Sequence, residues 1–276
     1  MAARFRLGSS LVAALLSAVL VLLGGPGAQA AGACGSTALA HRGAWSSKVD
    51  ENTIESIERA HQLGAFTEND VFLSSDGGFV IIHNQSLRHT TNCTGDVKNT
   101  PLAVIKQCRT TPNGLRIPTA VEVFNTLAGN PGQLIDLEVK GPGWFQHGNA
   151  KLVELRNAAV AAGVLNRVFF SNDTTYQTLT ALRDSAPNAQ TAWKPDSDEP
   201  DFTPAHASAL STDAVMAWGT QWSTKEKVAG FQQAGFQVWA KRSDNQQVWT
   251  RNWRLGLKAQ LTNLPGTYKT WCNSVV

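Results

Sequence analysis

The sequence lacks the marks of several common functional classes. Its formal net charge is only +3, whereas a nucleic-acid-binding protein needs a concentrated basic stripe. It contains no C-x-x-C pair of the kind that binds zinc. It also lacks the G-x-G-x-x-G turn that opens a dinucleotide-binding fold. No internal repeat or low-complexity linker occurs. We therefore expect no nucleic-acid partner, no structural zinc and no doubly wound nucleotide-binding domain.

A long apolar run occurs only near the N-terminus. Arg4 and Arg6 precede the apolar segment 10–23, and the small residues Ala28 and Ala30 form a small-x-small cleavage site. This layout predicts a secretory signal peptide over residues 1–30, cleaved near Ala30, and a secreted extracellular protein. The apolar run is shorter than the roughly 20 residues of a membrane-spanning helix, so we expect no stable membrane anchor. Removal of the two arginines lowers the net charge from +3 to +1, because no acid precedes residue 31.

Short apolar, β-branched segments alternate with helical patterns over residues 31–276. Strands are expected at Thr37–Ala40, Phe66–Leu73, Phe79–Ile82, Gln133–Val139, Arg167–Phe170, Gln190–Trp193, Ala214–Ala217, Gln237–Ala240 and Ala259–Thr262. Helices are expected at Thr53–Leu63, Ala120–Leu127, Ala150–Ala162, Thr174–Arg183, Lys225–Ala234 and Gln246–Leu255. Repeated strand–helix order predicts a parallel sheet, and the length suits one TIM (β/α)8 barrel domain.

The predicted organisation also includes two loop segments and one strand more than a barrel needs. A small loop insertion is expected around residues 84–118, and 195–204 is expected to be a loop. The sequence predicts nine strand segments, whereas a TIM barrel has eight strands, so we expect one short strand near 190–217 to be irregular.

Four cysteines lie after the predicted signal peptide. An even number in an exported chain indicates two disulfides, and four cysteines allow three pairings. We favour Cys93–Cys108, because these residues bracket one polar loop. That leaves Cys34–Cys272, which would fasten the first strand of a closed barrel to the last.

Charged residues occupy two of the predicted strands. Glu68 and Asp70 are two residues apart, so they share a face of their strand at a spacing of roughly 6.6–6.8 Å. Asp136, Glu138 and Lys140 alternate in the same way with apolar residues. The apolar face of a barrel strand turns outward to the helices, so the charged face turns inward. Buried carboxylates need a counter-ion.

Two histidines complete a set of residues suited to phosphoester cleavage. His41 follows the first predicted strand and His83 the third, at strand ends of the kind that carry catalytic groups in TIM barrels. Two imidazoles with a pKa of about 6.5 can divide the work of a general base and a general acid. Carboxylate oxygens suit one divalent cation, Ca²⁺ or Mg²⁺. Arg42 and Lys140 suit phosphate oxygens.

The motifs resemble those of the glycerophosphodiester phosphodiesterase family. They are His41-Arg42-Gly43, Glu51-Asn52-Thr53, Gly64-Ala65-Phe66-Thr67-Glu68-Asn69-Asp70-Val71, Asp76-Gly77, His83, Thr90-Thr91-Asn92, Ile117-Pro118-Thr119, Leu137-Glu138-Val139-Lys140 and Leu261-Thr262-Asn263-Leu264-Pro265. The resemblance implies a TIM barrel with a divalent cation that hydrolyses glycerophosphodiesters to glycerol 3-phosphate and an alcohol. It also implies the following roles: the acid–base pair His41 and His83, the metal ligands Glu68, Asp70 and Glu138, the phosphate contact Arg42 with Lys140 nearby, and Glu51, which helps build the site.

Several positions depart from the family pattern. Asp50 replaces a proline, Asn84 and Asn263 each replace an aspartate, and 240–242 reads Ala-Lys-Arg where Thr-Val-Asn is more usual. The last two changes lie near the expected pocket rim. Four tryptophans lie near predicted strand ends, at Trp45, Trp193, Trp218 and Trp239, and they indicate either an apolar pocket or plain packing. Of these we expect Trp239 to contact the substrate.

Other functions compete with this interpretation. Phospholipase D-type hydrolysis of lysophospholipids or sphingomyelin uses a similar barrel, but the motifs at 41–43 and 51–53 favour the first reading. A non-catalytic exported headgroup-binding protein would not need His41 and His83. We expect a monomer that acts on a small phosphodiester or lysophospholipid. Lys194, which follows a predicted strand, is a further candidate phosphate contact.

Overall fold

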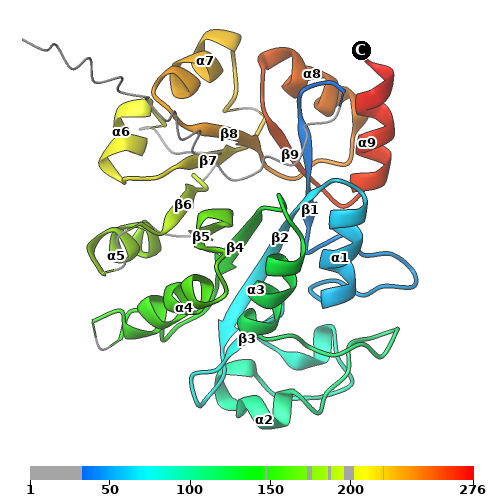
Figure 1. Ribbon diagram of the computed structural model, residues 1–276, viewed down its shortest axis with the longest axis vertical. Helices are drawn as coiled ribbons and strands as arrows, with labels where there is room; N and C mark the ends of the chain where they lie inside the picture. The colour runs from blue at the N-terminus through cyan, green and yellow to red at the C-terminus, as the bar shows by residue number, and fades with distance from the viewer. Residues whose placement is uncertain (1–32, 147, 173–175, 186–187, 196–201, 220) are drawn as a thin grey trace, which may run out of the picture.

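Eight parallel strands close into a barrel with helices outside it (Figure 1). The computed structural model describes residues 33–276 except 147, 173–175, 186–187, 196–201 and 220. The predicted signal peptide lies outside the described residues. The barrel strands are β1 (Thr37–His41), β2 (Phe66–Leu73), β4 (Ile135–Val139), β5 (Val168–Asn172), β6 (Gln190–Trp193), β7 (Ala214–Ala217), β8 (Gln237–Ala240) and β9 (Ala259–Thr262). Strand β1 pairs with both β2 and β9, which closes the ring. The predicted TIM barrel is confirmed.

The ninth strand is not where we expected it. β6 and β7 both pair within the barrel, so the expectation of an irregular strand within 190–217 is wrong. The additional strand is β3 (Phe79–Ile81), which pairs antiparallel with β2. The reason is the connection, 74–78, which is too short for the crossover of a dozen or more residues that joins parallel strands. Strand β2 is also longer than its neighbours, and β3 pairs with its protruding end.

Helices surround the barrel (Figure 1). They are α1 (Ile54–Gln62), α3 (Ala120–Gly129), α4 (Ala150–Ala161), α5 (Gln177–Ser185), α6 (Pro204–Ala209), α7 (Lys225–Gln233), α8 (Gln246–Leu255) and α9 (Pro265–Ser274). The short helix α2 (Leu102–Ile105) lies in the insertion instead, and 3₁₀ turns occur at Leu87–His89, Val97–Asn99 and Leu165–Arg167. The capping boxes Thr53–Ser56 and Thr119–Glu122 begin α1 and α3. None of the described helices combines the length and apolar character of a membrane span.

Strand alternation separates two kinds of core. On β4, Ile135, Leu137 and Val139 pack outward against the helices, while Asp136 and Glu138 take the other face and are buried. The barrel interior holds a smaller apolar cluster that includes Phe169, Met216 and Trp239. Apolar side chains therefore fill part of the interior, and charged ones occupy the part near the carboxyl ends of β2 and β4.

Both predicted disulfides are present. Cys93–Cys108 closes the insertion at 84–118, whose apolar residues pack with Phe72 and Val80 of the β2–β3 hairpin. Cys34–Cys272 joins the segment before β1 to α9 rather than to the last strand. Helix α9 lies beside β1 (Figure 1), so the bond still fastens the two ends of the barrel together.

Candidate active site

A cavity of about 250 Å³ opens at the carboxyl end of the barrel. It is lined by His41, Arg42, Glu68, Asp70, His83, Glu138, Lys140, Lys194, Met216, Trp218, Lys241, Arg242 and Leu261. The structure thus brings together the histidines, the carboxylates and the two cations, Arg42 and Lys140, that the sequence analysis predicted to lie near phosphate. Trp239 is different: it is 2% exposed, its ring centroid lies 5.0 Å from that of Phe169, and it packs in the core. Trp218 lines the cavity instead.

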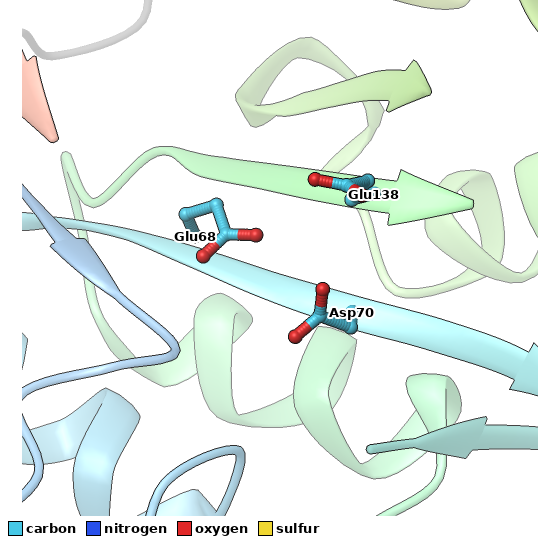
Figure 2. A group of neighbouring side chains, drawn as sticks. All are labelled: Glu68, Asp70 and Glu138. Carbon is cyan, nitrogen blue, oxygen red and sulfur yellow. The ribbon is translucent and has the colours of Figure 1, made fainter. Parts of the chain in front are cut away.

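Three buried carboxylates share one side of this cavity. The register of β2 with β4 places Asp70 beside Glu138, and Glu68 lies two residues before Asp70 (Figure 2). One oxygen from each residue lies within 4.8 Å of the others. Burial, reinforced by the negative charge of Asp70, raises the pKa of Glu68 well above its ordinary value. A divalent cation would relieve this repulsion, and the all-oxygen donor set fits Ca²⁺ or Mg²⁺.

Two lysines balance part of the negative charge. Lys140 Nζ lies 3.2 Å from Asp70 Oδ1 and 2.7 Å from Glu138 Oε1. Lys194 Nζ lies 2.8 Å from Glu138 Oε2 and 3.0 Å from Asp136 Oδ2. Burial alone would raise the pKa of Glu138, but Lys194 and Lys140 lower it to about 2. Lys194, considered above as a phosphate contact, is therefore tied to two carboxylates, and Asp136 is part of the same ion-pair network.

The turn after β1 positions Arg42. Its backbone N–H donates to Glu68 Oε2 (3.0 Å), and its guanidinium donates to both oxygens of Glu51 (3.1 Å each). Gly43 permits this turn, because it has a φ of +81° and a Cβ there would clash with the Ser56 side chain. Glu51 therefore helps build the site, by holding Arg42, without lining the cavity itself.

Asn52 also belongs to the site. The sequence analysis found it within the motif Glu51-Asn52-Thr53 but assigned it no role. Its Nδ2 donates to Asp70 Oδ2 (2.9 Å), and its Oδ1 accepts from Asn69 Nδ2 (3.0 Å) and from the Asp70 backbone N–H (3.2 Å). These bonds orient the Asp70 carboxylate toward the cavity. The signal was the position of Asn52 directly after Glu51, in a motif shared with the family.

His41 is oriented by a chain of two further residues. Its Nδ1 lies 2.7 Å from Asn263 Oδ1. Asn263 donates through Nδ2 to Asp244 Oδ2 (2.7 Å) and through its backbone N–H to Asp244 Oδ1 (2.7 Å). Because the amide nitrogen faces Asp244, the amide oxygen accepts from His41, which places the proton on Nδ1 and the lone pair on Nε2. Burial lowers the pKa of His41 to about 4, with Arg42 and Arg242 adding to the effect.

His83 reaches the cavity by a different route from the one we expected. It does not end a parallel barrel strand, because β3 runs antiparallel to β2. The returning chain pairs Ile82 N–H with Asp70 O (3.0 Å), and this brings His83 back to the level of the carboxylates. Its Nδ1 lies 3.3 Å from Asn84 Oδ1.

The fold and the site define a TIM-barrel protein whose carboxyl end gathers carboxylates, imidazoles and basic side chains in one cavity, with three carboxylates that could hold a metal. The sequence model of the Glycerophosphoryl diester phosphodiesterase family matches residues 41–267. The chain belongs to that family.

Individual relatives agree over part of their length. A glycerophosphodiester phosphodiesterase of Caldanaerobacter subterraneus subsp. tengcongensis is 42% identical over 109 residues, which are 37% of this chain and 44% of the relative. One from Bacillus subtilis is 34% identical over 130 residues, 42% of this chain and 43% of the relative. The matches thus span less than half the length of these curated relatives.

Solved structures show the same fold. A glycerophosphodiester phosphodiesterase from Parabacteroides distasonis superposes with a TM-score of 0.76 at 16% identity, covering 87% of this chain and 98% of its own. A phosphodiesterase from Oleispira antarctica, solved with the product sn-glycerol-3-phosphate, gives a TM-score of 0.70 at 23% identity, with 85% and 96% coverage.

Proposed function

We propose that the protein hydrolyses glycerophosphodiesters to glycerol 3-phosphate and an alcohol, with His41 and His83 as the acid–base pair and one divalent cation at Glu68, Asp70 and Glu138. The observation that carries this proposal is that His41, His83 and the three carboxylates line a single cavity. Family membership and the activity for which the relatives from Caldanaerobacter and Bacillus are named support it.

The residues divide the work according to their charges. A phosphodiester carries one negative charge, which repels a nucleophile until cations neutralise its oxygens. Arg42 and Lys140 line the cavity and can contact those oxygens. A cation held by the carboxylates would supply further neutralisation of the same charge. Either Ca²⁺ or Mg²⁺ suits the donor set.

His41 is suited to act first as the base. Its Nδ1–H is held by Asn263, so Nε2 can take a proton. With a glycerol substrate, we propose that Nε2 takes the proton of the hydroxyl next to the phosphoester and that this oxygen attacks phosphorus, which avoids the entropic cost of recruiting water. The bond from phosphorus to the other alcohol breaks, and protonated His83 gives its proton to that leaving oxygen. Water then opens the cyclic phosphate as the two histidines exchange roles.

The experiment is a product assay on the purified, disulfide-bonded protein. Glycerophosphoglycerol, glycerophosphocholine and lysophosphatidylcholine are supplied separately with Ca²⁺ or Mg²⁺, and glycerol 3-phosphate and choline are both measured. We expect its release from the first two substrates, and near-complete loss in His41→Ala and His83→Ala. His89→Ala, at an exposed histidine of the insertion, is the matched control and keeps full activity.

Other outcomes point to the alternatives. Cleavage of lysophosphatidylcholine alone, with release of choline, would assign the phospholipase D-type function. Binding of all three substrates without turnover would assign a non-catalytic headgroup-binding role.

We also propose that a single catalytic domain, residues 31–276, is exported after cleavage at Ala30 and acts as a monomer without a membrane anchor. Two disulfides among the described residues support export, because such bonds persist in oxidising compartments. N-terminal sequencing of the protein from culture medium should begin at Ala31, and light scattering should give the monomer mass. An N-terminus at Met1 or retention in cells would contradict export.

A further inference from the structure

Among the residues that the structure describes, the wall of the cavity opposite the carboxylates carries two cations, Lys241 and Arg242. Around the barrel the strands follow the order β1, β2, β4, β5, β6, β7, β8, β9, so β7 and β8 lie across the ring from β2 and β4. Trp218 directly follows β7, and Lys241 and Arg242 directly follow β8; all three line the cavity. Lys241 lies two residues beyond the inward-facing Trp239, on the same face of the chain and nearer the mouth.

Trp218 and Lys241 form one surface. Lys241 Nζ lies 5.2 Å from the centroid of the Trp218 ring, within the range of a cation–π interaction. Trp218 is 41% exposed. A ring in such a position could bind a quaternary ammonium group, but its face already contacts an ammonium ion. The wall therefore repels a cationic substituent rather than attracting one.

Cations line the cavity on both sides. Lys140, Lys194 and Arg42 each contact carboxylates of the site. Among the described residues that line the cavity, the acids Glu68, Asp70 and Glu138 all come from β2 and β4. Lys241 and Arg242 thus add two positive charges on the far side.

The acid next along the chain from this wall is Asp244. It accepts hydrogen bonds from Thr262 Oγ1 (2.8 Å) and from the backbone and side-chain nitrogens of Asn263 (2.7 Å each). Its carboxylate oxygens are turned toward β9, so they serve Asn263 and the orientation of His41.

We propose that Lys241 and Arg242 bind the alcohol side of the substrate and select glycerophosphodiesters whose alcohol carries a second anionic group, such as a phosphate ester, over those that carry a cationic amine. This inference rests on the proposed function of the same cavity. The reacting phosphate belongs near the carboxylates and histidines, and the glycerol moiety is uncharged. An anionic substituent on the leaving alcohol gains from two cations on the far wall, and a guanidinium beside an ammonium suits phosphate oxygens.

Three substrates with the same glycerophosphoryl group test the proposal. Glycerophosphocholine has a cationic alcohol, glycerophosphoglycerol an uncharged one, and glycerophosphoglycerol with a terminal phosphate an anionic one. We expect kcat/KM to be highest for the phosphate-bearing substrate and lowest for the choline ester, with about a tenfold difference or more between them. The difference should shrink as salt is raised from about 0.02 M to 0.3 M, because ions screen exposed charges.

Variants of the wall separate selection from catalysis. Lys241→Val with Arg242→Asn should lower the ratio of kcat/KM for the phosphate-bearing substrate to that for glycerophosphoglycerol about tenfold. Lys258→Ala removes an exposed lysine before β9, at the other end of the barrel, and should change none of the three. An unchanged preference in the double variant would overturn the proposal.

The outcomes also separate this inference from the proposed function. Hydrolysis of all three substrates with equal kcat/KM would keep the function and overturn the selection. Calorimetric binding to the His83→Ala protein measures selection without turnover, and equal affinities there would overturn it as well.

The sequence also contains four acidic residues after β6, in the segment 196–201, which lies outside the described residues. A preference for the choline ester, by either measurement, would show that the cationic wall does not set headgroup choice.

Discussion

His41 Nδ1 lies 2.7 Å from the side-chain oxygen of Asn263. Asn263 departs from the aspartate that is usual at this place in the family, so a neutral amide supports the imidazole here. The negative charge belongs to Asp244, which is the next partner in the chain of hydrogen bonds. Its carboxylate accepts a hydrogen bond from the side-chain nitrogen of Asn263. The pair therefore fixes which imidazole nitrogen carries the proton without placing a carboxylate against the ring.

Asn263→Ala should lower kcat about tenfold or more and change KM by less than about twofold, because general-base catalysis contributes about 10²–10⁴ and depends on the correct tautomer. The ¹⁵N shifts of His41 should show loss of the Nδ1–H form. Asn157→Ala, at an exposed asparagine of α4, is the control. An unchanged tautomer and kcat would show that Asn263 does not position His41.

Exchanging the two partners tests the same relationship by rescue. Asn263→Asp alone sets two carboxylates against each other, and we expect poor activity. Asn263→Asp with Asp244→Asn restores the hydrogen bonds and places a carboxylate beside His41, which favours the imidazolium ion. The double variant should recover most of the kcat lost in Asn263→Ala, with the acidic limb of its pH profile at higher pH. No recovery would contradict the assigned chain of hydrogen bonds.

The pH dependence of stability should report the burial of His41. Burial lowers the pKa of His41 to about 4, below the unfolded value of about 6.5. The unfolded chain therefore binds a proton before the folded one does, and stability falls as pH falls from about 6.5 toward 4. In EDTA, the urea midpoint of the wild type should decrease more between pH 7 and 5 than that of His41→Gln. Equal decreases would contradict this origin.

Lys194→Met should destabilise the fold strongly. Lys194 is 4% exposed and pairs with Asp136 and Glu138, so its loss leaves two buried carboxylates with less compensation, at a cost of about 3–5 kcal/mol. Lys151→Met breaks a surface pair with Glu154 and should cost about 1 kcal/mol or less. Denaturant unfolding of both variants measures the difference, and similar costs would refute the structural role of Lys194.

Much of the barrel was predictable because parallel strands bury both faces and read as short apolar runs. The site carboxylates were predictable for a related reason, since Asp136 and Glu138 interrupt an apolar strand with a period of two. The short helix α2 lies in a segment expected to be a loop, and helices α6 and α9 were also missed. Both begin at a proline, Pro204 and Pro265, which is favourable in a first helical turn but reads as a loop signal in sequence.

Features that depend on distant partners were not predictable. The ion pair of Lys194 with Glu138 joins residues 56 positions apart in the chain, so the sequence alone could not distinguish it from a phosphate contact. Trp239 and Trp218 both lie at strand ends, and only the height of each residue within the barrel decides that the first packs in the core and the second lines the cavity. The antiparallel course of β3 followed from the short connection 74–78, a local signal that outweighs strand counting.

The most direct test of the central claim is turnover of glycerophosphoglycerol before and after removal of divalent cations. The carboxylates of Glu68, Asp70 and Glu138 lie close enough to share one ion. We predict no release of glycerol 3-phosphate in EDTA, full recovery when Ca²⁺ or Mg²⁺ is returned, and weak recovery in Glu68→Gln despite an unchanged fold by circular dichroism. Undiminished turnover after exhaustive chelation, or no turnover with either ion, would contradict the account.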